Sequence, residues 1–185
     1  MHITGSALSI SENSKEACYK ALKIAKEKNP NVLISFDPNL RPEMLDIDSI
    51  LKICKPVLDS TTILLPSGEE AEMLAGISGE IKASKKLLEM GPEFVVLKQG
   101  KMGCTVFNKD HQEGLKINGF KANEIDPTGA GDSFDGAFII GYLAGWELEK
   151  TARFANAVGA LKVEYFGPMP ETTYEEVLKL MEKKK

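Results

Sequence analysis

The chain is poor in the residues that build metal centres and disulfide frameworks. Its 185 residues include three cysteines, two histidines and one tryptophan. Cys18, Cys54 and Cys104 are odd in number, far apart and set in apolar surroundings, which indicates reduced core thiols. A disulfide framework is therefore not expected, and with only His2 and His111 available a histidine-based metal site is not expected either.

Long hydrophobic runs and an excess of positive charge are also lacking. No apolar stretch approaches the ~20 residues that a membrane-spanning helix needs, and residues 1–5 do not resemble a signal peptide. The formal net charge is −4 and the pI is about 5.4, which gives no electrostatic case for nucleic-acid binding. We therefore expect a cytoplasmic protein with no membrane or nucleic-acid partner.

What is present is the pattern of a folded α/β protein. An apolar content of 43% in 185 residues fits a single domain, residues 1–185, with a sizeable core. Short strand-like runs alternate with amphipathic helices, which predicts a mostly parallel sheet covered on both faces. Strands are predicted at 32–36, 61–65, 94–97 and 104–107, the last two as an antiparallel pair joined by a tight glycine-containing turn. Helices are predicted at 14–28, 47–54, 68–75, 81–90, 133–143, 149–165 and 173–182.

The most informative segment is Asp126-Pro127-Thr128-Gly129-Ala130-Gly131-Asp132. Its small residues let backbone N–H groups close around an anion, and a helical pattern of apolar residues follows directly. The turn is therefore placed at a helix N-terminus, where unpaired N–H groups and the helix dipole favour negative charge. The segment predicts a phosphate-binding turn.

Asp132 has two interpretations. A carboxylate beside a phosphate site would repel the ligand unless it accepts a proton from an attacking hydroxyl, which predicts a general base. Alternatively, Asp132 is an ordinary helix N-cap. The turn is neither a Walker loop nor a dinucleotide fingerprint, because the lysine of the first and the third glycine of the second are absent.

Two further loops are predicted at the same edge of the sheet. Parallel strands direct their carboxyl ends to one edge, where α/β proteins bind ligands. Asp37, Asn39 and Arg41 follow one predicted strand, and residues 66–70 follow another. Arg41 can hold a phosphate or a sugar-acid carboxylate, and Asp37 and Asn39 can bond substrate hydroxyls. Their alternatives are a surface arginine and ordinary turn chemistry.

The segment 126–139, DPTGAGDSFDGAFI, resembles the C-terminal signature of the phosphofructokinase-B-type, ribokinase-like carbohydrate kinases. Residues 36–42, FDPNLRP, resemble a segment of 2-keto-3-deoxygluconate kinases and fructokinases. Residues 95–104 and 155–161 are similar to the family's nucleotide-contacting strand-turn-strand and to the helix beside its adenine pocket. The resemblance implies a three-layer α/β/α fold and an ATP-dependent sugar kinase, with 2-keto-3-deoxygluconate or fructose as the substrate.

The same resemblance implies roles for single residues. Asp132 is then the base that deprotonates the sugar hydroxyl, and the amides of Gly129, Ala130 and Gly131 form the anion hole. Nucleotide contacts are implied for Lys98, Gly100, Gly103 and Asn156. The alternatives are a solvent-facing lysine for Lys98 and, for Asn156, a polar residue bonded to a nearby loop.

Cofactors follow from the resemblance as well. ATP and Mg²⁺ are expected, and Asp126 corresponds to a position that helps bind a monovalent cation such as K⁺ beside the anion loop. Glu70 corresponds to a metal-linked glutamate, although Ser67 replaces the family's asparagine three residues earlier. The alternative for Glu70 is a carboxylate that complements a helix N-terminus.

The resemblance covers only the C-terminal portion of the family. The family's N-terminal portion and the lid that closes over the sugar have no counterpart here. Because lid closure excludes water and completes such sites, we expect either a kinase that completes its site by forming a homo-oligomer or comes from a longer product, or a truncated, non-catalytic nucleotide-binding remnant or partner subunit. An exposed sheet edge would favour pairing with another chain.

Overall fold

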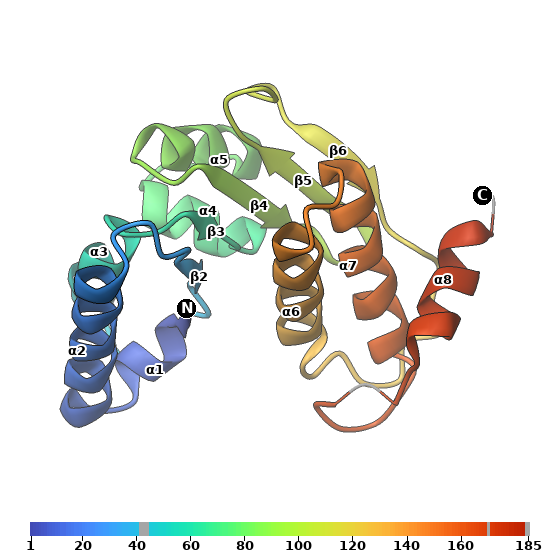
Figure 1. Cartoon of the computed structure of the whole chain (residues 1–185), viewed down its shortest axis with the longest axis horizontal. Coiled ribbons are helices and arrows are strands. Elements are labelled where there is room, and N and C mark those ends of the chain that lie inside the picture. Colours follow the sequence, from blue (N-terminus) through green and yellow to red (C-terminus); the bar gives the residue numbers. More distant parts are fainter. Residues whose placement is uncertain (41–44, 170, 184–185) are drawn as a thin grey trace. The chain divides into compact units, whose positions relative to one another are not determined.

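A computed structural model describes residues 1–40, 45–169 and 171–183 and confirms the α/β fold (Figure 1). The six strands follow the order β1-β2-β3-β4-β5-β6. The chain forms two compact units. Residues 1–97 and 107–114 make the N-terminal unit, and residues 98–106 and 115–185 make the C-terminal unit. The single domain expected over residues 1–185 stays a prediction.

Parallel strands form the centre of the N-terminal unit. The register pairs Ile3 with Phe36, Phe36 with Leu64, and Leu64 with Val95. These side chains are almost fully buried, because a parallel sheet covered on both faces has no solvent-facing side. The strands are β1 (His2–Thr4), β2 (Ser35–Asp37), β3 (Ile63–Leu64) and β4 (Phe94–Lys98).

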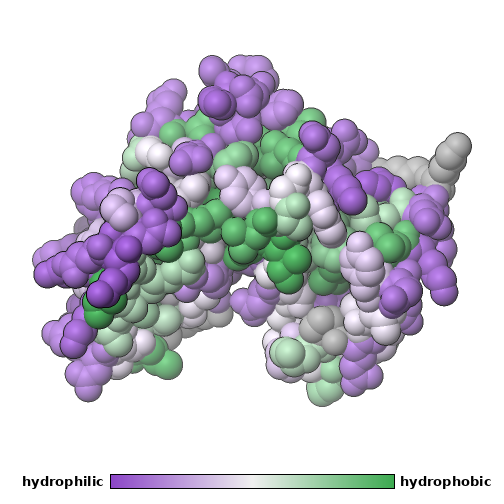
Figure 2. All heavy atoms as spheres, in the orientation of Figure 1, coloured by the Kyte–Doolittle hydropathy of each residue, from purple (hydrophilic) through white to green (hydrophobic). Residues whose placement is uncertain are grey.

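The helices of this unit bury one face each and leave the other in solvent. In α2, Leu22 is the buried residue, and many of the side chains at the left of Figure 2, where this helix lies, are hydrophilic. Helix α3 continues to Leu58 instead of ending at Cys54 as predicted, and it contains Pro56 in its last turn. The helices are α1 (Gly5–Ser9), α2 (Glu12–Lys28), α3 (Ile47–Leu58), α4 (Gly68–Ala75) and α5 (Glu80–Glu89).

The C-terminal unit contains an antiparallel strand pair and three helices. Strands β5 (Gly103–Phe107) and β6 (Leu115–Asn118) pair antiparallel, and β6 was missed by the sequence analysis. A 3₁₀ turn, Gly100–Met102, precedes β5. Helix α7 contacts α6, α8 and β6. The helices are α6 (Ala130–Leu143), α7 (Leu148–Lys162) and α8 (Tyr174–Glu182).

The three cysteines are free thiols, and Cys18 is partly buried and packs against the core. Cys54 and Cys104 are buried, and burial raises the pKa of each thiol to about 12. Within the described ranges, no helix combines the length and the apolar character needed to cross a membrane.

Candidate active site

The anion loop of the C-terminal unit leads directly into α6. Gly129 is the N-cap residue and has a left-handed backbone, with φ of 78°. A Cβ atom at this position would collide with the carbonyl oxygen of Pro168. Only glycine meets both conditions without strain, so this residue fixes the direction in which the chain enters the helix.

Backbone donors at the start of α6 are partly used within the loop. The N–H of Ala130 donates to the oxygen of Pro127 at 3.1 Å, and the N–H of Ser133 donates to Gly129 at 2.9 Å. Among the residues that the structure describes, the N–H groups of Gly131 and Asp132 have no acceptor. Of the three amides predicted for the anion hole, that of Ala130 is engaged within the loop, and those of Gly129 and Gly131 have no acceptor among the described residues.

Asp132 lies in the first turn of α6 with an exposed side chain. The N-cap position belongs to Gly129, so the alternative role of Asp132 as an N-cap does not apply. Its carboxylate makes no hydrogen bond or ion pair with the described part of the chain. This carboxylate is therefore available to accept a proton, and its role as the base stays a prediction.

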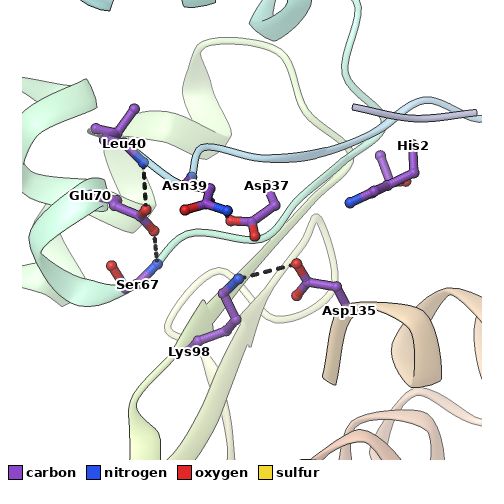
Figure 3. A network of polar contacts seen from close by, with 9 residues as sticks. His2, Asp37, Asn39, Leu40, Ser67, Glu70, Lys98 and Asp135 are labelled. Atoms are coloured by element: carbon purple, nitrogen blue, oxygen red, sulfur yellow. Dashed lines mark hydrogen bonds and ion pairs between the residues drawn. The ribbon is translucent and has the colours of Figure 1, made fainter. Parts of the chain in front are cut away.

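A buried ion pair lies beside the anion loop. The ammonium of Lys98, at the end of β4, is 3.2 Å from Oδ2 of Asp135 (Figure 3). The two side chains are 15% and 2% exposed. The same ammonium lies 3.7 Å from the position of a Cβ on Gly131. Lys98 is thus not the solvent-facing lysine of the alternative interpretation but a cation held next to the anion loop.

Asp135 was not among the predicted site residues. It lies three residues after Asp132 on α6, inside an otherwise apolar run. A charged residue at a buried helical position needs a partner of opposite sign, and this signal was available from the sequence.

Asp126 uses both carboxylate oxygens within its own unit. Oδ1 accepts the N–H of Thr128 at 2.9 Å, and Oδ2 accepts the N–H of Gly167 at 2.8 Å. Hydrogen bonds from the Thr128 side chain and backbone, then from Gly167, lower the pKa of Asp126 to about 2, and Lys162 adds a smaller electrostatic contribution. The ammonium of Lys162 donates to the backbone oxygen of Asp126 at 2.8 Å.

In the N-terminal unit, the loops after β2 and β3 meet at Glu70. Its Oε1 accepts the N–H of Leu40 at 2.9 Å, and Oε2 accepts the N–H of Ser67 at 2.7 Å (Figure 3). Two of the three loops expected at one edge therefore contact each other. The contact with Ser67, the N-cap of α4, is what the alternative interpretation of Glu70 predicts.

The substrate residues predicted after β2 are partly described. Asp37 is 4% exposed, and its Oδ1 accepts the N–H of Asn39 at 3.3 Å. Asn39 has φ of 36°, a conformation that asparagine tolerates better than most residues. Turn chemistry thus accounts for this contact, and Arg41 lies outside the described residues.

The remaining predicted nucleotide residues differ in their surroundings. Gly100 is exposed. Gly103 is buried, and a Cβ there would collide with the backbone of Ile117, so its glycine is needed for strand pairing. Asn156 is 7% exposed and donates to the oxygens of Ile117 at 3.1 Å and Asn118 at 3.3 Å. The alternative interpretation predicts this contact.

The described residues contain no group of three or more His, Cys, Asp or Glu side chains that could hold a metal ion. The metal roles predicted for Glu70 and Asp126 stay predictions.

Comparison with known proteins gives matches to sugar kinases. A sequence model described as pfkB family carbohydrate kinase matches residues 1–174. The 5-dehydro-2-deoxygluconokinase of Clostridium perfringens (strain 13 / Type A) is 34% identical over 166 residues, which cover 87% of this chain and 48% of that protein. Fructokinase-1 of Oryza sativa subsp. japonica is 33% identical over 189 residues, covering 96% and 57% respectively.

A solved structure gives the same result for the fold. A putative ribokinase II from E. coli, in complex with ATP and Mg²⁺, matches with a TM-score of 0.88 at 36% sequence identity. The match covers 97% of this chain and 57% of that one. The chain spans about half the length of the curated relatives it matches.

Proposed function

We propose that this chain, which belongs to the pfkB family of carbohydrate kinases, carries the ATP-binding and proton-accepting part of a sugar kinase. The reaction would transfer the γ-phosphoryl group of ATP to a hydroxyl of a sugar or sugar acid. The observation that carries the proposal is the exposed carboxylate of Asp132, which makes no bond to the described residues and lies in the helix turn with the available amides.

The chemistry at this turn would be an in-line displacement. The substrate hydroxyl loses its proton to a carboxylate oxygen of Asp132 as its oxygen attacks the γ-phosphorus. The bond to the β,γ-bridging oxygen breaks, and ADP leaves with that oxygen. Because the protein contributes mainly positioning and charge stabilisation in such reactions, the amides of Gly131 and Asp132 and the ammonium of Lys98 would bear the charge of the transferred group.

ATP and Mg²⁺ are the proposed cofactors. The E. coli neighbour was solved with both, and Lys98 beside Gly131 supplies a fixed cation where phosphate oxygens would lie. When bound, Mg²⁺ neutralises phosphate charge. Asp135 would keep the Lys98 ammonium in place, because a buried carboxylate at 3.2 Å restricts its movement.

The proposed substrate is a keto sugar or keto sugar acid. The relatives described above act, by their names, on 5-dehydro-2-deoxygluconate and on fructose, and the sequence resemblance favours 2-keto-3-deoxygluconate or fructose. Asp37, Asn39 and Arg41 are the proposed contacts for hydroxyl or carboxylate groups. We also propose a cytoplasmic setting, in which the free thiols would stay reduced.

A second candidate follows from the length of the match. Since the chain spans about half of its relatives, it can also be a nucleotide-binding remnant or partner subunit that does not catalyse transfer alone. Self-association would supply the missing surfaces in the first case and is not needed in the second.

Phosphoryl transfer by the purified chain distinguishes the two candidates. The chain is incubated with MgATP and a panel of sugars and sugar acids, and phosphorylated product is measured by mass spectrometry. Asp132→Asn should lower turnover by about 10²–10⁴-fold, because the amide cannot accept the proton, while MgATP affinity measured by calorimetry stays the same.

Glu149→Gln is the matched control, because Glu149 is an exposed acid in the first turn of α7. It should keep the turnover of the unchanged chain. Equal turnover in both variants would remove Asp132 from the mechanism, and MgATP binding without product would favour the non-catalytic candidate.

A further inference from the structure

Lys162, in the last turn of α7, is a fully buried lysine. Its exposed fraction is 0%, although lysine is almost never buried without a partner. The ammonium donates to the backbone oxygen of Asp126 at 2.8 Å and to that of Tyr165 at 3.2 Å. Burying a charge is costly unless hydrogen bonds and an opposite charge compensate for it, so this arrangement calls for a functional reason.

The opposite charge lies on the residue that the ammonium contacts. The carboxylate of Asp126 has a pKa of about 2, so it is ionised at neutral pH. Its two oxygens accept backbone N–H groups, one from Thr128 inside the anion loop and one from Gly167. Lys162 and Asp126 therefore form a compact charged unit in which the cation contacts carbonyl oxygens.

The segment that contains Lys162 packs against the anion loop and makes hydrogen bonds to it. We call residues 162–168 the supporting loop. The oxygen of Val163 accepts the N–H groups of Ile125 at 2.7 Å and Asp126 at 3.1 Å, and Gly167 bonds the Asp126 carboxylate. The backbone of Gly129 packs against Pro168. The supporting loop thus holds the chain on both sides of residues 126–129.

We propose that the ammonium of Lys162 is a built-in monovalent cation that takes the place of K⁺ beside the anion loop. The sequence resemblance implies an exchangeable cation near Asp126. In the structure, however, the backbone oxygens of Asp126 and Tyr165 are bonded to an ammonium, and both carboxylate oxygens accept amides. An ammonium resembles K⁺ in charge and size, so the ammonium of Lys162 can supply at these oxygens the positive charge that a K⁺ ion would supply.

The proposal predicts that the stability and the MgATP affinity of the protein do not depend on K⁺. An exchangeable ion orders its loop only while bound, and therefore makes stability and ligand affinity depend on its concentration. A covalently attached ammonium is always present. The effect on MgATP rests on the proposed function, whereas the effect on the order of residues 126–129 does not.

The test compares the unchanged chain with Lys162→Met, which keeps an unbranched apolar side chain and removes the ammonium group. Melting temperature and MgATP affinity are measured in KCl, NaCl, NH₄Cl and tetramethylammonium chloride at equal ionic strength. Lys121→Met is the matched control, because Lys121 is an exposed lysine of the same unit. All salts should give the unchanged chain and the control the same values.

Lys162→Met should melt at a lower temperature and bind MgATP at least about tenfold more weakly. K⁺ and NH₄⁺ should restore part of both losses, while tetramethylammonium, which is too large for the site, should restore neither. Restoration by small monovalent cations is a result that a purely packing role of Lys162 would not give.

Three outcomes would overturn the proposal: a K⁺-specific gain in the unchanged chain, identical behaviour of Lys162→Met and Lys121→Met, or losses that no cation relieves. If Lys162→Met does not fold, the salt series on the unchanged chain still decides. Failure of the unchanged chain to bind MgATP in any salt would refute the proposed function, while its melting temperatures would still test Lys162.

Discussion

Glu70 in the N-terminal unit and Asp132 in the C-terminal unit occupy the same position in their helices, yet their carboxylates are used in opposite ways. Each is the third residue of its helix. Glu70 accepts N–H groups from Leu40 and Ser67, whereas Asp132 accepts none from the described residues and is exposed. A glutamate can reach back to its N-cap amide, but the shorter aspartate leaves both its carboxylate and the neighbouring amides available.

The difference separates a structural carboxylate from a chemical one. The hydrogen bonds of Glu70 join two loops of one unit, so removal of its carboxylate should lower the stability of the fold. Asp132 makes no such bond with the described residues, so its removal should lower turnover and leave stability nearly unchanged.

Gly129→Ala should have the largest effect on stability. The left-handed backbone and the collision with Pro168 should destabilise the C-terminal unit by about 2–4 kcal/mol and abolish measurable MgATP binding. Denaturation by urea and calorimetry check both. Gly136→Ala is the control, because nothing lies within 4 Å of a Cβ there, and it should be neutral or stabilising by up to about 1 kcal/mol. Similar behaviour of the two variants would show that the loop tolerates a side chain.

Glu70→Gln should cost about 1–2 kcal/mol of unfolding free energy, because an amide cannot accept both N–H groups. The Mg²⁺ dependence of any phosphoryl transfer should not change. Glu69→Gln, at the exposed neighbour, should leave stability within about 0.5 kcal/mol of the unchanged chain. Unchanged stability of Glu70→Gln with a raised Mg²⁺ requirement would restore the metal-linked role and break the comparison.

The smallest expected effect is the contribution of Asp126 to stability at acid pH. Its pKa of about 2 in the folded chain lies below the ordinary value of 3.8, so its contribution to stability is present above about pH 4 and is lost between about pH 4 and pH 2. Asp126→Asn should therefore show a shallower fall in melting temperature over this window than the unchanged chain. Parallel curves would mean that the carboxylate has no linkage to folding.

Much of the fold could be predicted from periodicity. Helix α4 has the predicted bounds, because glycine residues mark both of its ends. Strand β6 was missed because Leu115–Asn118 has only four residues and little apolar character. Helix α1 was missed because five residues are too few to show a helical period. Ends of other elements moved by a few residues, as for α7, which ends at Lys162 instead of Tyr165.

The site could be predicted only in part. The glycine turn and Asp132 are contiguous in sequence, so their chemistry was visible. The partners of Asp126 and Lys98 are contributed from α7 and α6, tens of residues away, and no local pattern specifies them. For Asn156 and Glu70 the sequence left a ligand role and a structural contact open, because a polar residue near a motif does not show which backbone groups it will bond.

The division into two units has a covalent consequence. The chain passes from one unit to the other at three places: between Leu97 and Lys98, between Val106 and Phe107, and between Gly114 and Leu115. A single cut at any one of these peptide bonds would leave two connections intact. Neither unit can therefore be expressed as one uninterrupted piece of the sequence. A chain with a rearranged sequence that keeps both units must still connect them at all three places.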